Sequence, residues 1–361
     1  MGHRMILVGT GGWGEWWCRD FLPPNVADGV VEVVAAVDLD PAALENAKKH
    51  LGLTDAQCFS DVEKAFAQVE ADCCAIVVPP RFHEQVVDCA LRHGMHILTE
   101  KPIADTLEGA VRIADKVRRA GVKMGVTMSH RFDMDKTTLR EELQSGRNGR
   151  LDYLCCRYST DLRRAGCWGF RHEMDHPLLL EGAVHHLDLL ADMAGAPVET
   201  VYATTWNPPW SDFKNHAQGL VQITCENGVR ISYEGADTNA VGLHPWANEY
   251  IRAECEQATL ILDHRQMERF VYNPEATWTH AREGEGTKLP MLAQPKWANA
   301  WLIEKFIGWL DGGSPMETRV EENLQAVAIV FAAIESSRTG LPVRVQDLLA
   351  KTREQVRADG T

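Results

Sequence analysis

Short apolar runs alternate with amphipathic stretches through the first third of the chain. Each run has the length of one strand, and the stretch after it repeats its apolar residues every three or four positions, as a helix does. Strands joined by such helices lie parallel in a doubly wound sheet. The predicted strands span residues 5–8, 30–37, 73–78, 96–99 and 122–128.

Residues with strong end preferences limit the predicted helices. Asp40 and Thr106 are placed to cap two helices, because their side chains accept hydrogen bonds from free backbone N–H groups. Gly121 is placed to end the second of these helices. Pro23-Pro24 predicts that the first helix ends near Phe21 and that a long connection leads to the next strand.

The pattern changes after a helix predicted at residues 136–143. Apolar and polar residues now alternate, as in antiparallel strands with one solvent-facing side. The sequence therefore predicts an α/β domain over residues 1–126 and an α+β domain with a large, mainly antiparallel sheet over residues 127–361. The strands of the second domain are predicted at 151–158, 200–206, 219–224, 229–234, 250–254 and 259–263, and helices at 297–310 and 320–337 are expected to close it.

Composition excludes several classes of partner. The chain has 361 residues, of which 45% are hydrophobic, which is enough for two cores. The net charge of −14 argues against nucleic acid and anionic membrane surfaces as partners. The sequence shows no apolar run of about 18 residues and no secretory signal pattern, so we expect a cytoplasmic protein. The 10 cysteines form no C-x-x-C pair, and we expect reduced, mostly buried thiols.

The first predicted strand runs directly into Gly9-Thr10-Gly11-Gly12-Trp13-Gly14, which fits the pattern G-x-G-x-x-G. Gly9 permits the tight turn, Gly11 lets the backbone approach a pyrophosphate, and Gly14 lets the helix pack close to the strand. Asp38 follows the next predicted strand, 24 residues after Gly14. A carboxylate there accepts hydrogen bonds from ribose hydroxyls and repels a 2′-phosphate. This order predicts a dinucleotide site that favours NAD over NADP.

Glu100-Lys101-Pro102 follows another predicted strand of the first domain. Ligands of doubly wound sheets bind at the carboxyl ends of the strands, so Lys101 is aimed at the crevice where a nicotinamide would lie. Pro102 makes a cis peptide bond possible.

These residues, with the segment 77–83, resemble the Gfo/Idh/MocA oxidoreductase family, which includes glucose–fructose oxidoreductase and inositol dehydrogenase. The resemblance extends over nearly the whole chain, through residues 181–190 to residues 333–340. It implies a Rossmann domain and a second domain that binds substrate and forms oligomers. It also implies that Pro79, His83, Glu100 and Lys101 contact the cofactor.

The segment Glu181-Gly182-Ala183-Val184-His185-His186-Leu187-Asp188 corresponds to the family's D-x-x-x-H motif and the helix after it. Glu181 stands where aspartate is commoner, and His185 matches the histidine. Residues four apart lie on one face of a helix, so Glu181 and His185 can address one substrate together. His186 is then expected to point elsewhere and to pack or hold a structural hydrogen bond.

The resemblance implies hydride transfer between the nicotinamide and a secondary alcohol of a sugar, sugar derivative or cyclitol. The hydroxyl proton needs an uncharged acceptor, and His185 or Lys101 can take this role while the other holds the oxygen. Glu181 would orient a hydroxyl or the histidine. Further residues expected to line the substrate site are Arg131, Trp168, Arg171, His172 and His244.

His172-Glu173-Met174-Asp175-His176 fits H-E-x-x-H, the pattern of zinc metalloproteases. That site needs an unbroken helix through both histidines, whereas Pro177 disfavours the helical conformation for His176. We therefore predict no metal centre here, with a non-proteolytic ion bound by this stretch as the alternative.

Two other functions fit the same residues. Some family members oxidise C3 of a sugar transiently and cleave a glycosidic bond by elimination, and the aromatic segment 206–210 leaves room for a glycoside. Other members are non-catalytic sugar-sensing regulators, against which the presence of Lys101 and His185 argues. In each case we expect a homodimer or homotetramer, because a large sheet with one uncovered face needs a partner.

Overall fold

The computed structural model of the chain describes residues 2–359, which form two compact units. The first unit contains the residues up to Phe132, the segment Pro295–Leu324 and the residues from Thr352 on. The second contains Asp133–Gln294 and Gln325–Lys351. The first division lies close to the predicted boundary at residue 126, but two late segments that the prediction assigned to the second domain belong to the first unit.

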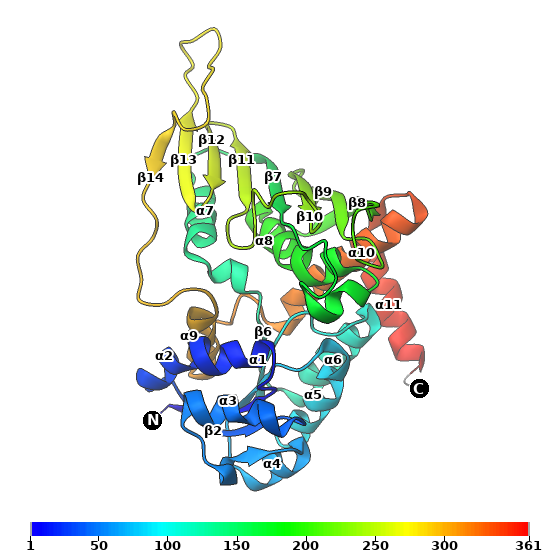
Figure 1. Ribbon diagram of the computed structural model, residues 1–361. Coiled ribbons are helices and arrows are strands. Elements are labelled where there is room, and N and C mark those ends of the chain that lie inside the picture. The colour runs from blue at the N-terminus through cyan, green and yellow to red at the C-terminus, as the bar shows by residue number, and fades with distance from the viewer. Residues whose placement is uncertain (1, 360–361) are drawn as a thin grey trace. The chain divides into compact units, whose positions relative to one another are not determined.

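The first unit is built on a parallel six-stranded sheet with the strand order β3-β2-β1-β4-β5-β6 (Figure 1). The order reverses between β1 and β4, and the carboxyl ends of strands at such a reversal form the ligand-binding crevice of a doubly wound sheet. The predicted α/β fold is confirmed. The strands are β1 His3–Val8, β2 Val31–Val37, β3 Cys58–Phe59, β4 Cys73–Ile76, β5 His96–Thr99 and β6 Met124–Val126.

The helix ends predicted at Asp40, Thr106 and Gly121 are confirmed. The Asp40 side chain accepts a hydrogen bond from the Ala42 N–H at the start of α3. Thr106 does the same for the Gly109 N–H in α6, and Gly121 ends α6 with a left-handed φ of 70°. The helices of this part are α3 Pro41–Leu51, α4 Val62–Gln68, α5 His83–Arg92 and α6 Leu107–Ala120.

The first helix does not end near Phe21, so that prediction is wrong. The chain continues from α1 (Trp13–Trp16) through a π-helical turn (Trp17–Phe21) into α2 (Leu22–Ala27). Pro23 and Pro24 lie in the first turn of α2, where a residue without an N–H group removes few helical hydrogen bonds. The π turn before them is closed by a hydrogen bond from the Leu22 N–H to the Trp17 carbonyl.

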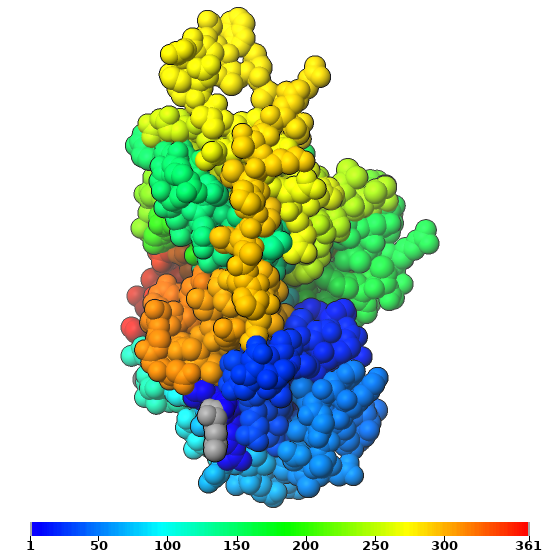
Figure 2. All heavy atoms as spheres, turned by 90° about the vertical axis from the view of Figure 1, so that its left-hand side faces the viewer, coloured from blue at the N-terminus to red at the C-terminus, as the bar shows by residue number. Residues whose placement is uncertain are grey.

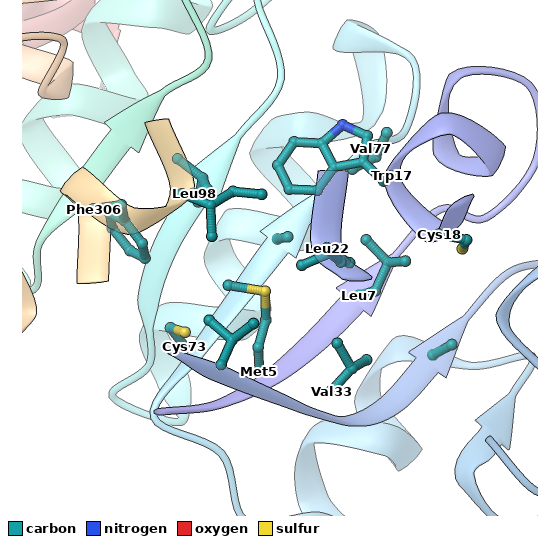
Figure 3. Packing of buried hydrophobic residues seen from close by; sticks show 14 of the residues in the cluster. Met5, Leu7, Trp17, Cys18, Leu22, Val33, Cys73, Val77, Leu98 and Phe306 are labelled. Carbon is teal, nitrogen blue, oxygen red and sulfur yellow. The ribbon is translucent and has the colours of Figure 1, made fainter. Parts of the chain in front are cut away.

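The helix α9 (Ala298–Leu310) was expected to close the second domain, but it packs in the first unit. Figure 3 shows its Phe306 next to Leu98 of β5, in the same buried cluster as Met5 of β1. The Asn25 amide of α2 donates to the Ala300 carbonyl of α9 at 2.9 Å. The amphipathic pattern predicted this helix, but such a pattern does not identify the surface that the helix covers.

The second unit contains a nine-stranded sheet with the order β14-β13-β12-β11-β7-β10-β9-β8-β15. Its strand pairs are antiparallel except for the parallel pair β7 and β10, which confirms the prediction of a large, mainly antiparallel sheet. The strands are β7 Leu151–Ser159, β8 Val198–Trp206, β9 Gln218–Cys225, β10 Arg230–Ala236, β11 Tyr250–Cys255, β12 Ala258–Asp263, β13 Gln266–Val271, β14 Thr287–Leu289 and β15 Val343–Arg344.

Side chains alternate across this sheet. Tyr233 of β10 and Cys156 of β7 are buried, and the helix α8 (Val184–Ala194) contacts these two strands. Tyr202 and Leu220, by contrast, are exposed. An exposed loop from residue 272 to residue 286 projects beyond the strands that it joins (Figures 1 and 2). The remaining helices are α7 Met134–Gln144, α10 Val320–Thr339 and α11 Val345–Asp359.

Two further expectations can be compared with the described residues. None of the described helices has the length and apolar character that crossing a bilayer requires. All ten cysteines are free thiols, and each except Cys167 is buried or half-buried, as predicted.

Candidate functional site

The loop between β1 and α1 has the shape that a pyrophosphate needs. Gly9 has a φ of 97°, and a Cβ there would lie 2.4 Å from the Val77 carbonyl oxygen. A Cβ on Gly14 would lie 2.3 Å from the Gly9 carbonyl oxygen. Gly12 is exposed and has open space where a Cβ would be, so its backbone is accessible to a ligand. The loop therefore fits a dinucleotide: Gly9 and Gly14 are required because neighbouring backbone atoms lie too close for a side chain, and Gly12 leaves room for the ligand.

Asp38 lies against this loop at the end of β2. One of its carboxylate oxygens, Oδ2, accepts hydrogen bonds from the N–H groups of Thr10 at 2.7 Å and Gly11 at 3.1 Å. The side chain is half-buried, so part of it still faces solvent and can accept ribose hydroxyls. Leu39, which sequence reasoning missed, is 86% exposed directly beside this carboxylate. An exposed apolar side chain at this position offers a surface for a flat base.

The Glu100 carboxylate accepts hydrogen bonds from several residues of the first unit. Its Oε1 accepts hydrogen bonds from the indole N–H groups of Trp13 at 2.8 Å and Trp17 at 2.9 Å. Its Oε2 accepts from the Thr127 hydroxyl at 2.7 Å and from the Lys101 N–H at 3.2 Å. Four donors therefore occupy a carboxylate that was predicted to contact the cofactor, and this gives Glu100 a structural position.

Lys101 follows Glu100 at the carboxyl end of β5. Its side chain is half-buried, and its peptide bond to Pro102 is cis, the form that the sequence made possible. Arg131 is also half-buried, in the 3-10 turn Ser129–Phe132 of the same unit.

Two of the predicted cofactor residues have different environments. Pro79 is exposed after β4. His83 is fully buried, with Nε2 2.8 Å from the Val78 carbonyl and Nδ1 3.1 Å from the Ile103 carbonyl. Burial lowers the pKa of His83, which favours its neutral ring. The predicted contact of His83 with the cofactor does not fit this position, because no part of the ring is accessible.

In the second unit, Glu181 and His185 flank the junction of a π-helical turn (Leu178–Ala183) and α8. The Glu181 carboxylate accepts a hydrogen bond from the Arg171 guanidinium at 2.9 Å. That guanidinium also lies over the Trp168 ring, 5.0 Å from its centroid. Three of the predicted substrate residues, Glu181, Arg171 and Trp168, are therefore brought together by the fold.

His185 is buried at the start of α8, with its ring edge-on to Trp246 at 5.1 Å. The π turn before it means that the spacing between Glu181 and His185 is not that of a regular α-helix. The sequence did not single out Trp246, whose indole lies beside His185, one of the two candidate proton acceptors.

His172 does not have the accessible position that was predicted for it. It is buried, its Nε2 lies 3.0 Å from the Leu162 carbonyl, and its ring stacks on Phe213 at 4.1 Å. The 3-10 turn Gly169–Glu173 ends before His176, so the two histidines of H-E-x-x-H do not share a helix. His244 is half-buried, 3.7 Å from the Asp263 carboxylate.

His186 makes structural hydrogen bonds, as expected. Its Nδ1 lies 3.0 Å from the Tyr233 hydroxyl, and its Nε2 lies 3.3 Å from Glu249. Glu249 also pairs with the buried Lys136 at 2.8 Å. Sequence reasoning missed this buried group of polar side chains, because they come from α7, α8, β10 and the loop before β11, with no spacing pattern in common.

Asp237 is a second buried carboxyl near this group. Its Oδ1 accepts a hydrogen bond from the Tyr158 hydroxyl at 3.1 Å. Burial raises the pKa of Asp237 to about 7, and the negative charge of Glu181 contributes in the same direction. The side chain therefore exchanges its proton near neutral pH.

Comparison with known proteins follows the same two-part division. The family model described as "Oxidoreductase family, NAD-binding Rossmann fold" matches residues 3–128. The model of the Gfo/Idh/MocA C-terminal domain matches residues 137–260.

Three relatives illustrate the range of similarity. The protein y4oX of Sinorhizobium fredii is 53% identical over 354 residues, which are 98% of each chain. The 1-carboxy-3-chloro-3,4-dihydroxycyclohexa-1,5-diene dehydrogenase of Comamonas testosteroni is 30% identical over 68% of this chain and 62% of its own. The inositol 2-dehydrogenase of Corynebacterium glutamicum (strain R) is 31% identical over 54% of this chain and 57% of its own.

Solved structures share the fold at low identity. An oxidoreductase from Agrobacterium radiobacter, in complex with NAD+, L-tartaric acid and magnesium, has a TM-score of 0.83 at 18% identity and covers 96% of this chain and 100% of its own. The WlbA dehydrogenase from Bordetella pertussis, in complex with NADH and UDP-GlcNAcA, has a TM-score of 0.76 at 22% identity and covers 95% of this chain and 99% of its own.

Proposed function

Because the chain belongs to the Gfo/Idh/MocA oxidoreductase family, whose first domain is an NAD-binding Rossmann fold, we propose that it is an NAD-dependent dehydrogenase of secondary alcohols. The substrate class is a sugar, sugar derivative or cyclitol. The observation that supports the proposal most is the glycine loop from Gly9 to Gly14, together with Lys101 at the carboxyl end of β5. Two relatives are named for an inositol and for a dihydroxylated cyclohexadiene, and these names support a hydroxylated ring as the substrate.

The cofactor would be held by the loop from Gly9 to Gly14 and by Asp38. The N–H groups of Gly12 and Trp13 would bind the pyrophosphate, since those of Thr10 and Gly11 donate to Asp38. The Asp38 carboxylate would accept the ribose hydroxyls. A 2′-phosphate would meet that negative charge, so NAD is the preferred cofactor. When bound, the nicotinamide supplies the acceptor for a hydride from the alcohol carbon.

The chain's own residues would handle the proton of that alcohol. His185 or Lys101 takes the proton in its uncharged form, and the other donates a hydrogen bond to the oxygen. Glu181, fixed by Arg171 at 2.9 Å, is suited to orient a neighbouring hydroxyl. Trp168 and Arg131 are proposed to line the substrate site.

The variants Lys101→Met and His185→Asn test these roles. Each is expected to lower kcat by about 10²-fold or more, because general acid–base groups contribute typically 10²–10⁴-fold. The NAD dissociation constant should stay within a few-fold in His185→Asn. The pH profile assigns the proton acceptor, since the variant that lacks the acceptor loses the acidic limb. Exposed Lys49→Met is the matched control. Wild-type turnover in both variants would contradict the proposal.

Glycoside cleavage through transient oxidation at C3 is the second candidate. It is favoured by exposed Trp206 and Trp210, which offer a second ring a stacking surface. Cleavage of a glycoside that requires NAD but accumulates no NADH would identify it.

We also propose a homodimer or homotetramer. The exposed face of the nine-stranded sheet carries Tyr202 and Leu220 among polar residues, and such a mixed face suits a protein interface. Mass measurement in solution tests this, and a monomer at micromolar concentration would contradict it.

A further inference from the structure

Trp13 stands apart from the other residues of the nucleotide loop. It begins α1, directly after the exposed Gly12, and 46% of the residue is exposed to solvent. An exposed indole is normally free to rotate, but this ring is held by its N–H group, which donates to Glu100 at 2.8 Å. It also contacts Trp16 and Phe21, with ring centroids 5.9 Å and 5.7 Å away. The ring is thus both accessible and fixed.

The acceptor of this hydrogen bond is a buried carboxylate that joins three elements. Trp13 and Trp17 reach Glu100 from the first helix, Thr127 reaches it from the end of β6, and the Lys101 N–H belongs to the segment after β5. Hydrogen bonds to a carboxylate are shorter and stronger than those between neutral groups. Removing one partner of a buried carboxylate strongly destabilises the folded protein. The folded state therefore keeps all of the donors in place.

We propose that these residues form a clamp with two effects, and we call Glu100, Trp13, Trp17 and Thr127 the Glu100 clamp. First, Glu100 is a positioning residue that fixes the backbone of Lys101 relative to the nucleotide loop. Second, the accessible face of Trp13 is an aromatic wall for the nicotinamide ring of the bound dinucleotide. The hydrogen bonds of the clamp and the stacking role of Trp13 were not among the sequence predictions, which assigned both Trp13 and Glu100 a direct contact with the cofactor.

The location of Trp13 within the first unit supports the second effect. It follows the glycines that receive the pyrophosphate, and its N–H partner is the neighbour of Lys101. The nicotinamide is joined to the pyrophosphate through a ribose and has to reach Lys101, so it would lie between these positions. A fixed indole favours a flat ring on its face, because stacking then costs little side-chain entropy.

Trp16 supplies a matched control. It lies one turn along, 45% of it is exposed, and its ring is covered by Arg19, whose guanidinium carbon is 4.3 Å from the ring centroid. The structure gives it no hydrogen bond to Glu100. Trp13→Leu and Trp16→Leu each remove one aromatic ring and leave an apolar side chain.

The wall is tested by the dissociation constant of NADH for the full-length protein. Trp13→Leu is expected to bind NADH about tenfold more weakly, because stacking on an aromatic ring contributes roughly 1–3 kcal/mol. Trp16→Leu should keep the wild-type affinity. Equal affinity of Trp13→Leu and the wild type would overturn the wall. This readout needs no substrate, so a failure of the proposed reaction would not affect it.

The positioning role is tested by Thr127→Val, which removes one donor to Glu100, with Thr127→Ser as the conservative rescue. If the dehydrogenase is active, Thr127→Val should lower kcat about tenfold through a misplaced Lys101 while the KM for substrate changes less than threefold. Thr127→Ser should restore kcat. An unchanged kcat in folded Thr127→Val, or a loss that Thr127→Ser does not restore, would overturn the role.

Discussion

At the scale of residues, the Asp38 carboxylate has a structural role, and we propose that it also selects the cofactor. It accepts hydrogen bonds from the N–H groups of Thr10 and Gly11, so it shapes the loop as well as the ribose site. In the proposed function, its negative charge would repel a 2′-phosphate. The sequence predicted the selective role from position alone, while the contact with the loop required the coordinates.

Asp38→Asn is expected to weaken NAD binding about 10- to 100-fold, because a hydrogen bond to a charged group contributes roughly 1.5–3 kcal/mol. NADP binding should improve or stay unchanged, since the repulsion is gone. Titration calorimetry with both cofactors measures the ratio. The control is Asp40→Asn, whose exposed side chain also caps α3 but lies outside the loop contacts. Equal losses for NAD and NADP would contradict the selective role of Asp38.

The buried Asp237 predicts a pH dependence of stability. Its pKa is raised to about 7 in the folded protein, so the folded state holds a proton that the unfolded state releases from about pH 4 upward. Stability should therefore fall by about 1.4 kcal/mol per pH unit between pH 4 and pH 7 from this group. Asp237→Asn removes that contribution and should be more stable than the wild type at pH 8 but not at pH 4.

Urea unfolding at a series of pH values measures this difference, with the exposed Asp152→Asn as the control. If the stability difference between Asp237→Asn and the wild type does not change with pH, Asp237 is not the group that holds the proton.

The sequence predicted the conformation of the glycine loop better than it predicted the surroundings of His83, His172 and Glu100. The glycines of the loop are required by backbone geometry, which the local sequence records. His83, His172 and Glu100 instead bond to groups outside their own elements: the Ile103 carbonyl 20 residues from His83, the Leu162 carbonyl 10 residues from His172, and the Trp17 indole 83 residues from Glu100. No local pattern distinguishes a histidine that faces a ligand from one that faces a carbonyl.

At the scale of elements, the first helix shows how a proline signal can mislead. Pro23-Pro24 correctly marks a break in regular α-helical hydrogen bonding, but the chain absorbs the break in a π turn and continues as α2. The buried Asn25 then ties α2 to α9. Tertiary packing of this kind outweighs local propensity, and it cannot be seen from the sequence of the helix itself.

The helix α9 gives a prediction at this scale. Phe306→Ala is expected to destabilise the first unit by about 3–5 kcal/mol, because it removes a fully buried aromatic ring from the core. Gly308→Ala is the matched control, since a Cβ there meets no neighbouring atom and alanine favours the helix. Denaturation followed by the fluorescence of bound NADH reports on this unit. Equal stability of Phe306→Ala and the wild type would show that α9 does not belong to its core.

For the whole molecule, the order of strands and helices was enough to predict both folds. Parallel strands joined by helices gave the first sheet, and alternating strands gave most of the second. The short strands β3, β14 and β15 were missed because they carry too few residues for a period. The six-residue strand β13 was missed as well. The prediction placed α9 in the wrong unit because its segment begins more than 160 residues after Phe132, where the first part of that unit ends.

The residues predicted for the site are divided between the two units. The cofactor residues and Lys101 belong to the first unit, while Glu181 and His185 belong to the second. The sequence named candidates in both, and each unit brings part of its own set together. Their joint action is a proposal that rests on chemistry and on the family.

The central claim is tested most directly by absorbance at the NADH band, with purified protein, NAD or NADP and a panel of monosaccharides, inositols, cyclic diols and glycosides. The account predicts that NADH accumulates with at least one free sugar or cyclic polyol, that NAD is preferred over NADP, and that Lys101→Met abolishes the signal. The contradicting result is tight NAD binding with no NADH from any free alcohol of the panel. Cleavage of a glycoside under those conditions would establish the second candidate function instead.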